Sequence, residues 1–257
     1  MLRPARLLVA VLVVLSPAPA CASDWIAIAA GAFTMGRDGG PADEAPAHRV
    51  RLPAFRIQAR KVTNREFAAY LERAGLTGPD GRRYDDDDAD ARIHRRGGRW
   101  VADAGFADHP AVEVSWFGAR DYCAALGARL PSEAEWERAA RSTDGRAYPW
   151  GAAPPSLERA VFGRAYNETA PGDGRPAGRS AEGVEDLLGN LREWTSSALM
   201  PYPWTAKAFT GAERVVVRGA SHDDPAESLS VTRRHAYERR GAAAGHHHVG
   251  FRCAKDH

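Results

Sequence analysis

The side chains most capable of chemistry lie in one stretch of the C-terminal part of the chain. This stretch holds an imidazole next to two carboxylates, then two guanidinium groups and a second imidazole: His222, Asp223, Asp224, Arg233, Arg234 and His235. An imidazole with adjacent carboxylates could hold a hard metal ion or act as a general base. The alternative is structural, because Asp before Pro commonly starts a turn and the arginines could pair with acidic loops. Both interpretations stay open at this point.

Two other motifs contain metal-binding residue types. His246 to His248 could bind zinc or copper, but consecutive side chains of an extended segment alternate between two faces, so at most two could reach one ion. A surface loop with adventitious metal affinity is the favoured interpretation. Asp85 to Asp88 with Asp90 matches the start of an EF-hand loop, yet Ala91 and Gly97 stand where that loop needs glycine and glutamate. We therefore expect a solvated acidic loop there.

The composition indicates a folded domain with no electrostatic preference for nucleic acid. Of the 257 residues, 44% are hydrophobic and 26% are charged, which allows a packed core and disfavours general disorder. The formal charge is +2, from 35 basic and 33 acidic side chains. Two basic residues, Arg3 and Arg6, lie in a predicted leader, so the mature chain has 33 of each. A neutral chain offers no case for nucleic acid or an anionic membrane as a partner.

Residues 1–22 are predicted to be a signal peptide. A positively charged start precedes an apolar run from Leu7 to Leu15, and Ala20 to Ala22 fits an A-x-A cleavage site. The run is too short to span a bilayer as a helix, and the two prolines after it disfavour a buried strand. Cys21 could instead carry a lipid anchor, although Ala18 suits that signal poorly. The protein is therefore expected to be periplasmic or secreted, with no membrane span.

Removal of the leader leaves two cysteines, Cys123 and Cys253. Exported proteins fold in an oxidising compartment, where an even number of cysteines favours a disulfide. Two free buried thiols are the alternative.

The candidate residues are carried by a chain with many short strands and few helices. Alternating apolar residues predict strands in 25–35, 50–57, 111–116, 214–218 and 249–253. Capping boxes predict helices after Thr63 and Ser132, and a further helix is expected over 118–126. Residues 77–106 form the least regular stretch. Since neither a repeat nor a linker divides the chain, one domain is expected.

Ordered segments from residue 25 to the C-terminus carry a more specific signal. They are Phe33–Gly36, Arg60–Asn64, His109–Pro110, Val114–Trp116, Arg129–Glu137, Tyr148–Gly151, Gly189–Thr195, Val217–Ser221 and Gly250–Cys253. Together they resemble the formylglycine-generating-enzyme family, also called sulfatase-modifying-factor domains. The resemblance implies an α+β, single-domain, C-type-lectin-like fold over residues 23–257. It also implies that Cys123 and Cys253 pair.

The resemblance sets an expectation about activity. The best-known members oxidise a cysteine of a sulfatase to formylglycine, using oxygen and a copper(I) ion held by two cysteines after the Gly-Ser turn. In this chain Asp224 and Leu229 occupy those two positions. A carboxylate is a poor ligand for copper(I) and an aliphatic side chain is none. Copper at a two-cysteine site and formylglycine-generating activity are therefore not expected.

The resemblance also suggests a calcium site and a role. Asn190 and Glu193 correspond to a calcium site of the family, whereas the family's other calcium site lacks its asparagine near Ala160. Without calcium, Asn190 would be a turn residue and Glu193 a salt-bridge partner. One exported branch of the family takes part in pyoverdine maturation in the bacterial periplasm.

Three functional hypotheses follow from these observations. The leading one is a periplasmic oxidative maturation or accessory oxidoreductase, with an unknown redox metal and an unknown small-molecule or peptide substrate. The six residues of the stretch 222–235 named above would carry out this activity. The resemblance places them near the family's active site. The alternatives are a non-catalytic binding module on a lectin-like fold and a true formylglycine-generating enzyme with relocated ligands.

Overall fold

The computed structural model describes residues 24–203 and 206–257. The predicted signal peptide and the proposed lipid site at Cys21 lie outside the described residues. Within the described ranges, none of the helices combines the length and the apolar character needed to pass through a bilayer.

Capping boxes start α1 (Asn64–Ala74) and α3 (Glu133–Arg141). At α1, the Thr63 hydroxyl accepts a hydrogen bond from the Glu66 N–H, and the Glu66 carboxylate accepts one from the Thr63 N–H over 2.8 Å. Ser132 begins α3 in the same way. These bonds satisfy backbone amides that have no partner within the helix. Both predictions of a capped helix are confirmed.

Two further helices are present. Ser115 caps α2 (Trp116–Ala125), which begins two residues before the predicted start. A single turn, α4 (Arg239–Ala242), was not predicted. Short 3-10 turns occur at 176–178 and 226–228.

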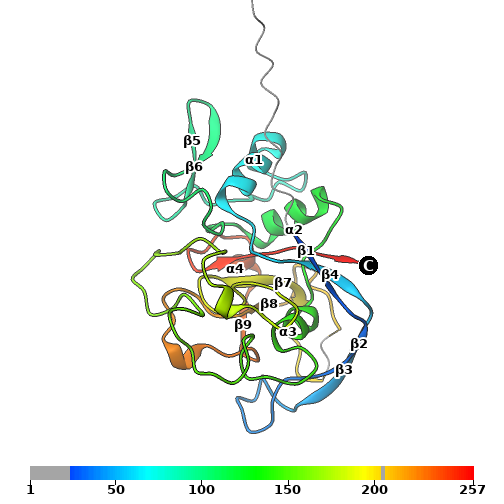
Figure 1. Ribbon diagram of the computed structural model, residues 1–257. Helices are drawn as coiled ribbons and strands as arrows, with labels where there is room; N and C mark the ends of the chain where they lie inside the picture. Colours follow the sequence, from blue (N-terminus) through cyan, green and yellow to red (C-terminus); the bar gives the residue numbers. More distant parts are fainter. Residues whose placement is uncertain (1–23, 204–205) are drawn as a thin grey trace, which may run out of the picture.

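Two sheets form the centre of the fold. The larger has four strands, in the order β10 (Val249–Gly250), β7 (Arg192–Ala198), β8 (Val215–Arg218) and β9 (Arg234–Tyr237). The smaller has three strands, in the order β1 (Trp25–Ile28), β4 (Phe55–Gln58) and β11 (Ala254–Asp256). All pairings are antiparallel except that of β10 with β7. Figure 1 shows β7, β8 and β9 in the middle of the molecule.

Two antiparallel ribbons extend from this centre. They are β2 (Gly31–Met35) with β3 (His48–Leu52), and β5 (Ile93–Arg96) with β6 (Arg99–Ala102). The β5–β6 ribbon projects beside α1, and the β2–β3 ribbon lies at the opposite end of the molecule (Figure 1). The β5–β6 hairpin falls inside the stretch 77–106, which was expected to be irregular.

The strand predicted over 111–116 is not formed. Glu113 has a φ of 58°, in the left-handed region, and a continuous strand cannot contain that conformation. Isolated bridges join Thr63 to Pro110 and Asp85 to Val114 instead. Residues 110–114 therefore connect the start of α1, through Pro110, with the acidic loop, through Val114.

The disulfide predicted between Cys123 and Cys253 is confirmed, with a Cα–Cα distance of 5.5 Å. It joins α2 to the segment before β11 inside an aromatic cluster that includes Phe67, Tyr122 and Phe251. The α+β prediction is confirmed as a mixed helix-and-strand single domain. The finer C-type-lectin-like label stays a prediction.

Candidate functional site

The predicted histidine–aspartate stretch forms a tight loop at the end of β8. Gly219 follows the strand with a φ of 86°, and a Cβ atom there would lie 2.9 Å from the carbonyl oxygen of Leu187. Both features favour glycine at this turn. The loop then returns to the start of β7, because the N–H of His222 donates to the carbonyl of Asn190 over 2.8 Å. Backbone contacts thus place residues 221–224 against the larger sheet.

Asp224 has the contacts of a loop-closing residue. Nη2 of Arg192 donates to its two carboxylate oxygens over 2.7 and 2.8 Å, and the Ser221 N–H donates over 2.8 Å. Burial raises the pKa of Asp224, but the hydrogen bonds and the guanidinium charge outweigh burial and bring it below its ordinary value. Its carboxylate is therefore ionised and engaged with a protein cation.

His222 and Asp223 lie at the edge of a group of histidines. His222 is fully buried, and its Nδ1 donates to the carbonyl of Asn190 over 3.0 Å. Its Nε2 finds no partner among the described residues, and burial lowers the pKa of the ring, which keeps it neutral. Asp223 accepts a hydrogen bond from Ser221 and lies 3.7 Å from Nε2 of His247.

The other three predicted residues lie apart from His222. Arg234 is buried and makes a bidentate ion pair with Glu133, at 2.9 Å for both bonds. Arg233 donates to the carbonyl of Ser228 over 3.4 Å. Burial, together with three nearby arginines, lowers the pKa of His235 to about 4, and its Nε2 has no partner among the described residues. The structure therefore joins His222, Asp223 and Asp224 in one loop, and of the other three residues only His235 is reached by the charge of Asp224.

The histidine triplet is packed rather than carried on an open surface loop. Nε2 of His246 donates to the carbonyl of Gly241 over 2.9 Å, and His248 shares a 2.6 Å hydrogen bond with the hydroxyl of Tyr237. All three rings are partly buried. Nε2 of His247 lies 3.3 Å from Nδ1 of His248 and 3.7 Å from Asp223, and the ring also approaches the acidic loop. The segment is a loop, as predicted, and its flanking rings pack on Tyr237 of β9.

The acidic loop contributes a carboxylate to the same region. One ligand atom each of Asp90, Glu113 and His247 lies within 4.8 Å of the other two. Glu113 is only 4% exposed. Burial and the charges of neighbouring aspartates raise its pKa to about 8. The expected solvated loop is thus in part a buried cluster.

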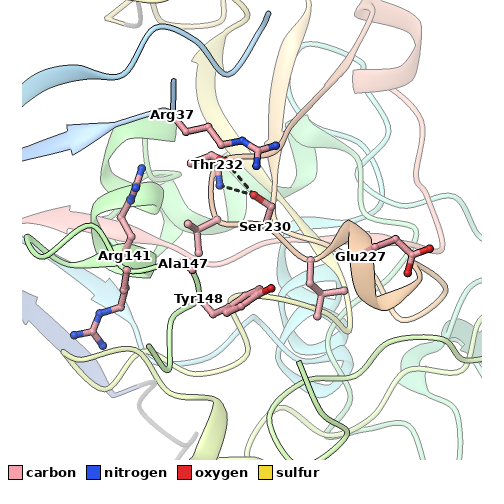
Figure 2. Close-up of a pocket in the computed structure, with 10 residues that line it drawn as sticks. Arg37, Arg141, Ala147, Tyr148, Glu227, Ser230 and Thr232 are labelled. Carbon is pink, nitrogen blue, oxygen red and sulfur yellow. Dashed lines mark hydrogen bonds between the residues drawn. The ribbon is translucent and has the colours of Figure 1, made fainter. Parts of the chain in front are cut away.

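A pocket of about 290 Å³ lies on another side of the loop that follows β8. Its lining residues come from four segments of the chain: Arg37, Arg141, Arg146, Ala147, Tyr148, Glu227, Leu229, Ser230, Val231 and Thr232. Figure 2 shows Ser230 and Thr232 hydrogen-bonded to each other below Arg37, with Arg141 and Tyr148 on the opposite wall. Leu229, at one of the two positions that the family resemblance assigns to copper-binding cysteines, is part of this wall.

Each of the three arginines of the pocket has an acidic partner. Arg37 pairs with Glu44 over 2.8 Å. Arg141 pairs with Glu137 over 3.0 Å, and Arg146 with Asp144 over 2.6 Å. The pocket is therefore polar and nearly neutral, with hydroxyl and guanidinium groups available for hydrogen bonding.

The side chains at the two copper-ligand positions do not fit copper(I). Asp224 is held by Arg192, and Leu229 is an apolar side chain. Among the described residues the cysteines are Cys123 and Cys253, and they form the disulfide. Copper(I) requires soft thiolate donors, and these positions supply a hard carboxylate and an aliphatic group.

The predicted calcium residues have protein partners. The side-chain oxygen of Asn190 accepts from the Ala170 N–H over 3.0 Å, and both carboxylate oxygens of Glu193 accept from Arg252 over 2.7 and 2.9 Å. The ammonium group of Lys61 lies beside them, 3.5 Å from Glu193. In this arrangement cations and amides already engage the oxygen donors, so calcium could bind them only after Lys61 moved.

The ammonium group of Lys61 takes the position that the calcium prediction assigns to the metal ion. Its Nζ also lies 3.1 Å from a carboxylate oxygen of Asp186 and 3.4 Å from the carbonyl of Gly189. The ammonium group of a lysine thus sits among oxygen atoms of three residues. Calcium binding by Asn190 and Glu193 stays a prediction, and it requires Lys61 to move.

Several residues of the site were not predicted. Arg192, Lys61, Asp90 and Glu113 come from segments far from residues 222–235 in the sequence. Gly219, two residues before Ser221, predicted a turn. No local pattern indicated which residues from distant segments would contact that turn. Only the charge density of 85–90 and the histidine triplet marked the second region.

Comparison with known proteins places the chain in a family. Residues 13–257 match the sulfatase-modifying factor enzyme 1-like domain, so the protein belongs to the formylglycine-generating-enzyme (sulfatase-modifying-factor) family. The formylglycine-generating enzyme of Streptomyces coelicolor is 31% identical over 310 residues, covering 95% of this chain and 96% of that enzyme. The predicted family resemblance is confirmed.

Other relatives are longer proteins. Hercynine oxygenase of Mycobacterium tuberculosis is 35% identical over 215 residues, covering 70% of this chain and 48% of the oxygenase. Serine/threonine-protein kinase Pkn1 of Chlamydia trachomatis is 35% identical over 245 residues, covering 91% of this chain and 38% of the kinase. The chain thus spans less than half of the length of these two relatives.

A solved structure shares the fold. PvdO from Pseudomonas aeruginosa superposes with a TM-score of 0.70 and 27% sequence identity, covering 91% of this chain and 94% of PvdO.

Proposed function

We propose that this protein is an exported member of the family that acts in the oxidative maturation of another molecule, as an oxidoreductase or its accessory, and that it does not convert cysteine to formylglycine. One observation carries the proposal. On the family fold, the two copper-ligand positions hold Asp224, clamped by Arg192, and the apolar Leu229. Hard and aliphatic groups cannot replace thiolates for copper(I).

The relatives support an oxidative role. Two of them are named as an oxygenase and as a formylglycine-generating enzyme, and the chain covers nearly all of the latter. The similarity to PvdO favours the exported branch that the sequence resembles. We propose a periplasmic or secreted location on the basis of the leader, with lipidation at Cys21 as the alternative form of attachment.

A non-catalytic binding role is the second candidate. The pocket beside Leu229 offers guanidinium groups, two hydroxyls and a tyrosine, and all of its arginines already have acidic partners. Such a lining suits recognition of a small polar ligand by hydrogen bonds. Fold alone does not distinguish a binding module from an enzyme.

The negative part of the proposal is tested with a sulfatase-type cysteine peptide. The purified protein is incubated with the peptide, oxygen and copper(I), and mass spectrometry measures conversion of cysteine to formylglycine. No conversion is expected, with the Streptomyces coelicolor enzyme as the positive control. Conversion by this chain would show a true formylglycine-generating enzyme with relocated ligands.

The positive part is tested in the source organism. Deletion of the gene is expected to cause accumulation of a less oxidised precursor in the exported fraction, detected by untargeted mass spectrometry. Complementation with the full chain should restore the product, whereas a chain without residues 1–22 should not. Unchanged metabolites and exported proteins in the deletion strain would favour the binding role.

A further inference from the structure

Four segments that are far apart in the sequence meet at His247. They are the acidic loop, the turn at Glu113, the loop that carries Tyr166 and the histidine triplet. The N–H of Glu113 donates to the carbonyl of His246 over 3.3 Å. A carboxylate oxygen of Asp86 accepts from the Gly245 N–H over 2.7 Å. These two bonds, one between backbone groups and one from a backbone N–H to the Asp86 carboxylate, tie the histidine triplet to the turn at Glu113 and to the acidic loop.

Glu113 points a buried carboxylate into this junction. The residue is 4% exposed, and no described residue donates a hydrogen bond to its side chain. The charged groups that act on it are acids: Asp86, Asp88 and Asp90. Glu113 is therefore a largely buried acid whose neighbouring charges are all of the same sign, an arrangement that disfavours its ionised form and that a cation would relieve.

Asp85 is a second buried acid in this junction, and it adds to the excess of acidic over basic groups there. Asp85 is 1% exposed, and neither of its carboxylate oxygens has a hydrogen-bond partner among the described residues. Arg83 and His94 contact other acids of the loop, Asp86 and Asp87. The junction therefore holds more acidic than basic groups, and a bound cation would balance it.

We propose that Asp90, Glu113 and His247 bind a divalent first-row transition-metal ion. Two carboxylate oxygens and one imidazole nitrogen form a donor set suited to zinc, manganese or iron(II) rather than to calcium or copper(I). Tyr166 is exposed and hydrogen-bonds to Asp90 over 2.5 Å, so the site lies within reach of solvent. Metal binding here does not depend on the function proposed above.

The side chains must close around the ion to bind it. The three ligand atoms lie within 4.8 Å of one another. Three ligands of one ion at tetrahedral angles, with bonds of about 2.1 Å, are about 3.4 Å apart. The ligand atoms therefore close by up to roughly 1.4 Å, which the partly exposed Asp90 and His247 can do by rotation.

The test is a titration of the purified, EDTA-dialysed mature protein with Co²⁺, followed by visible absorption, and then with Zn²⁺ in competition. We expect saturation at one ion per chain. Asp90→Asn, Glu113→Gln and His247→Gln are each expected to weaken binding by about tenfold to a hundredfold or more. Anomalous diffraction from crystals grown with Zn²⁺ should place the ion between the three residues.

His94→Gln is the matched control, since His94 pairs with Asp87 in the same acidic loop but lies outside the proposed ligand set. It should bind Co²⁺ as the wild type does. Thermal unfolding of each variant separates loss of a ligand from loss of the fold, and the two partly exposed positions provide variants that keep the core intact. Absence of a saturable site in the wild type, or unchanged binding in both D90N and H247Q, would overturn the proposal.

Discussion

At the scale of single residues, chemically capable side chains divide into those with partners and those without. Asp224 and Arg234 form buried or nearly buried ion pairs with Arg192 and Glu133. By contrast, Nε2 of His222 is buried without a hydrogen-bond partner among the described residues, and the largely buried Glu113 is surrounded by acids. The second kind indicates function more strongly, because an unpartnered buried polar group costs stability and needs a reason.

Lys61 provides the first prediction at this scale. Because its ammonium group lies among oxygens of Asp186, Gly189 and Glu193, we expect the melting temperature to be the same in EDTA and in calcium. Lys61→Met should lower the free energy of unfolding by about 3–5 kcal/mol, since it leaves a buried acid unpaired. Added calcium should restore part of this loss. Differential scanning calorimetry measures both effects.

Lys255→Met is the control for that variant, because Lys255 is a partly exposed lysine that lies over the ring of Trp25. It should show no calcium response. A wild-type protein that melts earlier in EDTA would instead support Asn190 and Glu193 as calcium ligands.

His235 predicts a dependence of stability on pH. Its folded pKa of about 4 lies below the unfolded value of about 6.5. Between these values the unfolded chain binds a proton that the folded ring does not, so stability is lost as the pH falls from 6.5 toward 4. Because the ring is only partly buried, we expect a loss on the order of 1 kcal/mol.

Urea unfolding as a function of pH measures this effect. His235→Gln should reduce the slope in that window, and the remaining slope should come from other buried histidines such as His222. His257→Gln, at the exposed C-terminus, should leave the slope unchanged. A variant H235Q with the full wild-type slope would contradict the assignment.

At the scale of elements, β7 holds the loop that follows β8. Arg192 begins β7 and reaches Asp224, and the carbonyl of Asn190 accepts from His222. The predicted site is therefore a property of two neighbouring strands and not of one sequence stretch. The histidine triplet is positioned in the same way, because Val249 pairs in parallel with Arg192.

Arg192→Met should release the loop without unfolding the sheet. Loss of a nearly buried charge pair is expected to cost about 2–3 kcal/mol, since Asp224 keeps only its bonds to Ser221. Hydrogen exchange should then accelerate at residues 219–229. Arg233→Met, which removes a single bond to a carbonyl, should leave this exchange unchanged. Equal protection in both variants would show that Arg192 does not hold the loop.

At the scale of the whole molecule, one covalent link spans about half of the chain. Cys123 and Cys253 are 130 residues apart and join α2 to the C-terminal segment. Closing so long a loop restricts the unfolded chain, which stabilises the fold by about 5 kcal/mol in the chain-entropy model. The small strands of the fold depend on such long-range links because each contributes few contacts of its own.

The double variant Cys123→Ala/Cys253→Ala should therefore lose about 2–5 kcal/mol in the free energy of unfolding. Urea unfolding of the variant and of the oxidised wild type measures the difference. Both cysteines are fully buried, so the alanines also remove two packed sulfur atoms, and the measured loss contains a cavity contribution beside that of the covalent link. Equal unfolding midpoints would mean that packing alone holds the C-terminal segment.

The sequence by itself determined the family, the capped helices and the strand over 215–218. These follow from local rules, such as the Thr63–Glu66 box, or from ordered motifs like Arg129–Glu137. It failed over 111–116, where tertiary contacts hold Glu113 at a positive φ, and it missed the hairpin of 93–102.

Only the tertiary structure decided which charges meet. Sequence spacing cannot show that Arg192 faces Asp224, that Lys61 reaches Glu193, or that His247 turns toward Glu113 while its neighbours pack on Tyr237. Side chains from distant segments become neighbours only when the strands pair and bury them. Whether a carboxylate forms an ion pair or lacks a partner depends on those neighbours. Burial makes an unpaired charge costly in free energy, whereas a paired charge is held by its partner and is not available to a ligand.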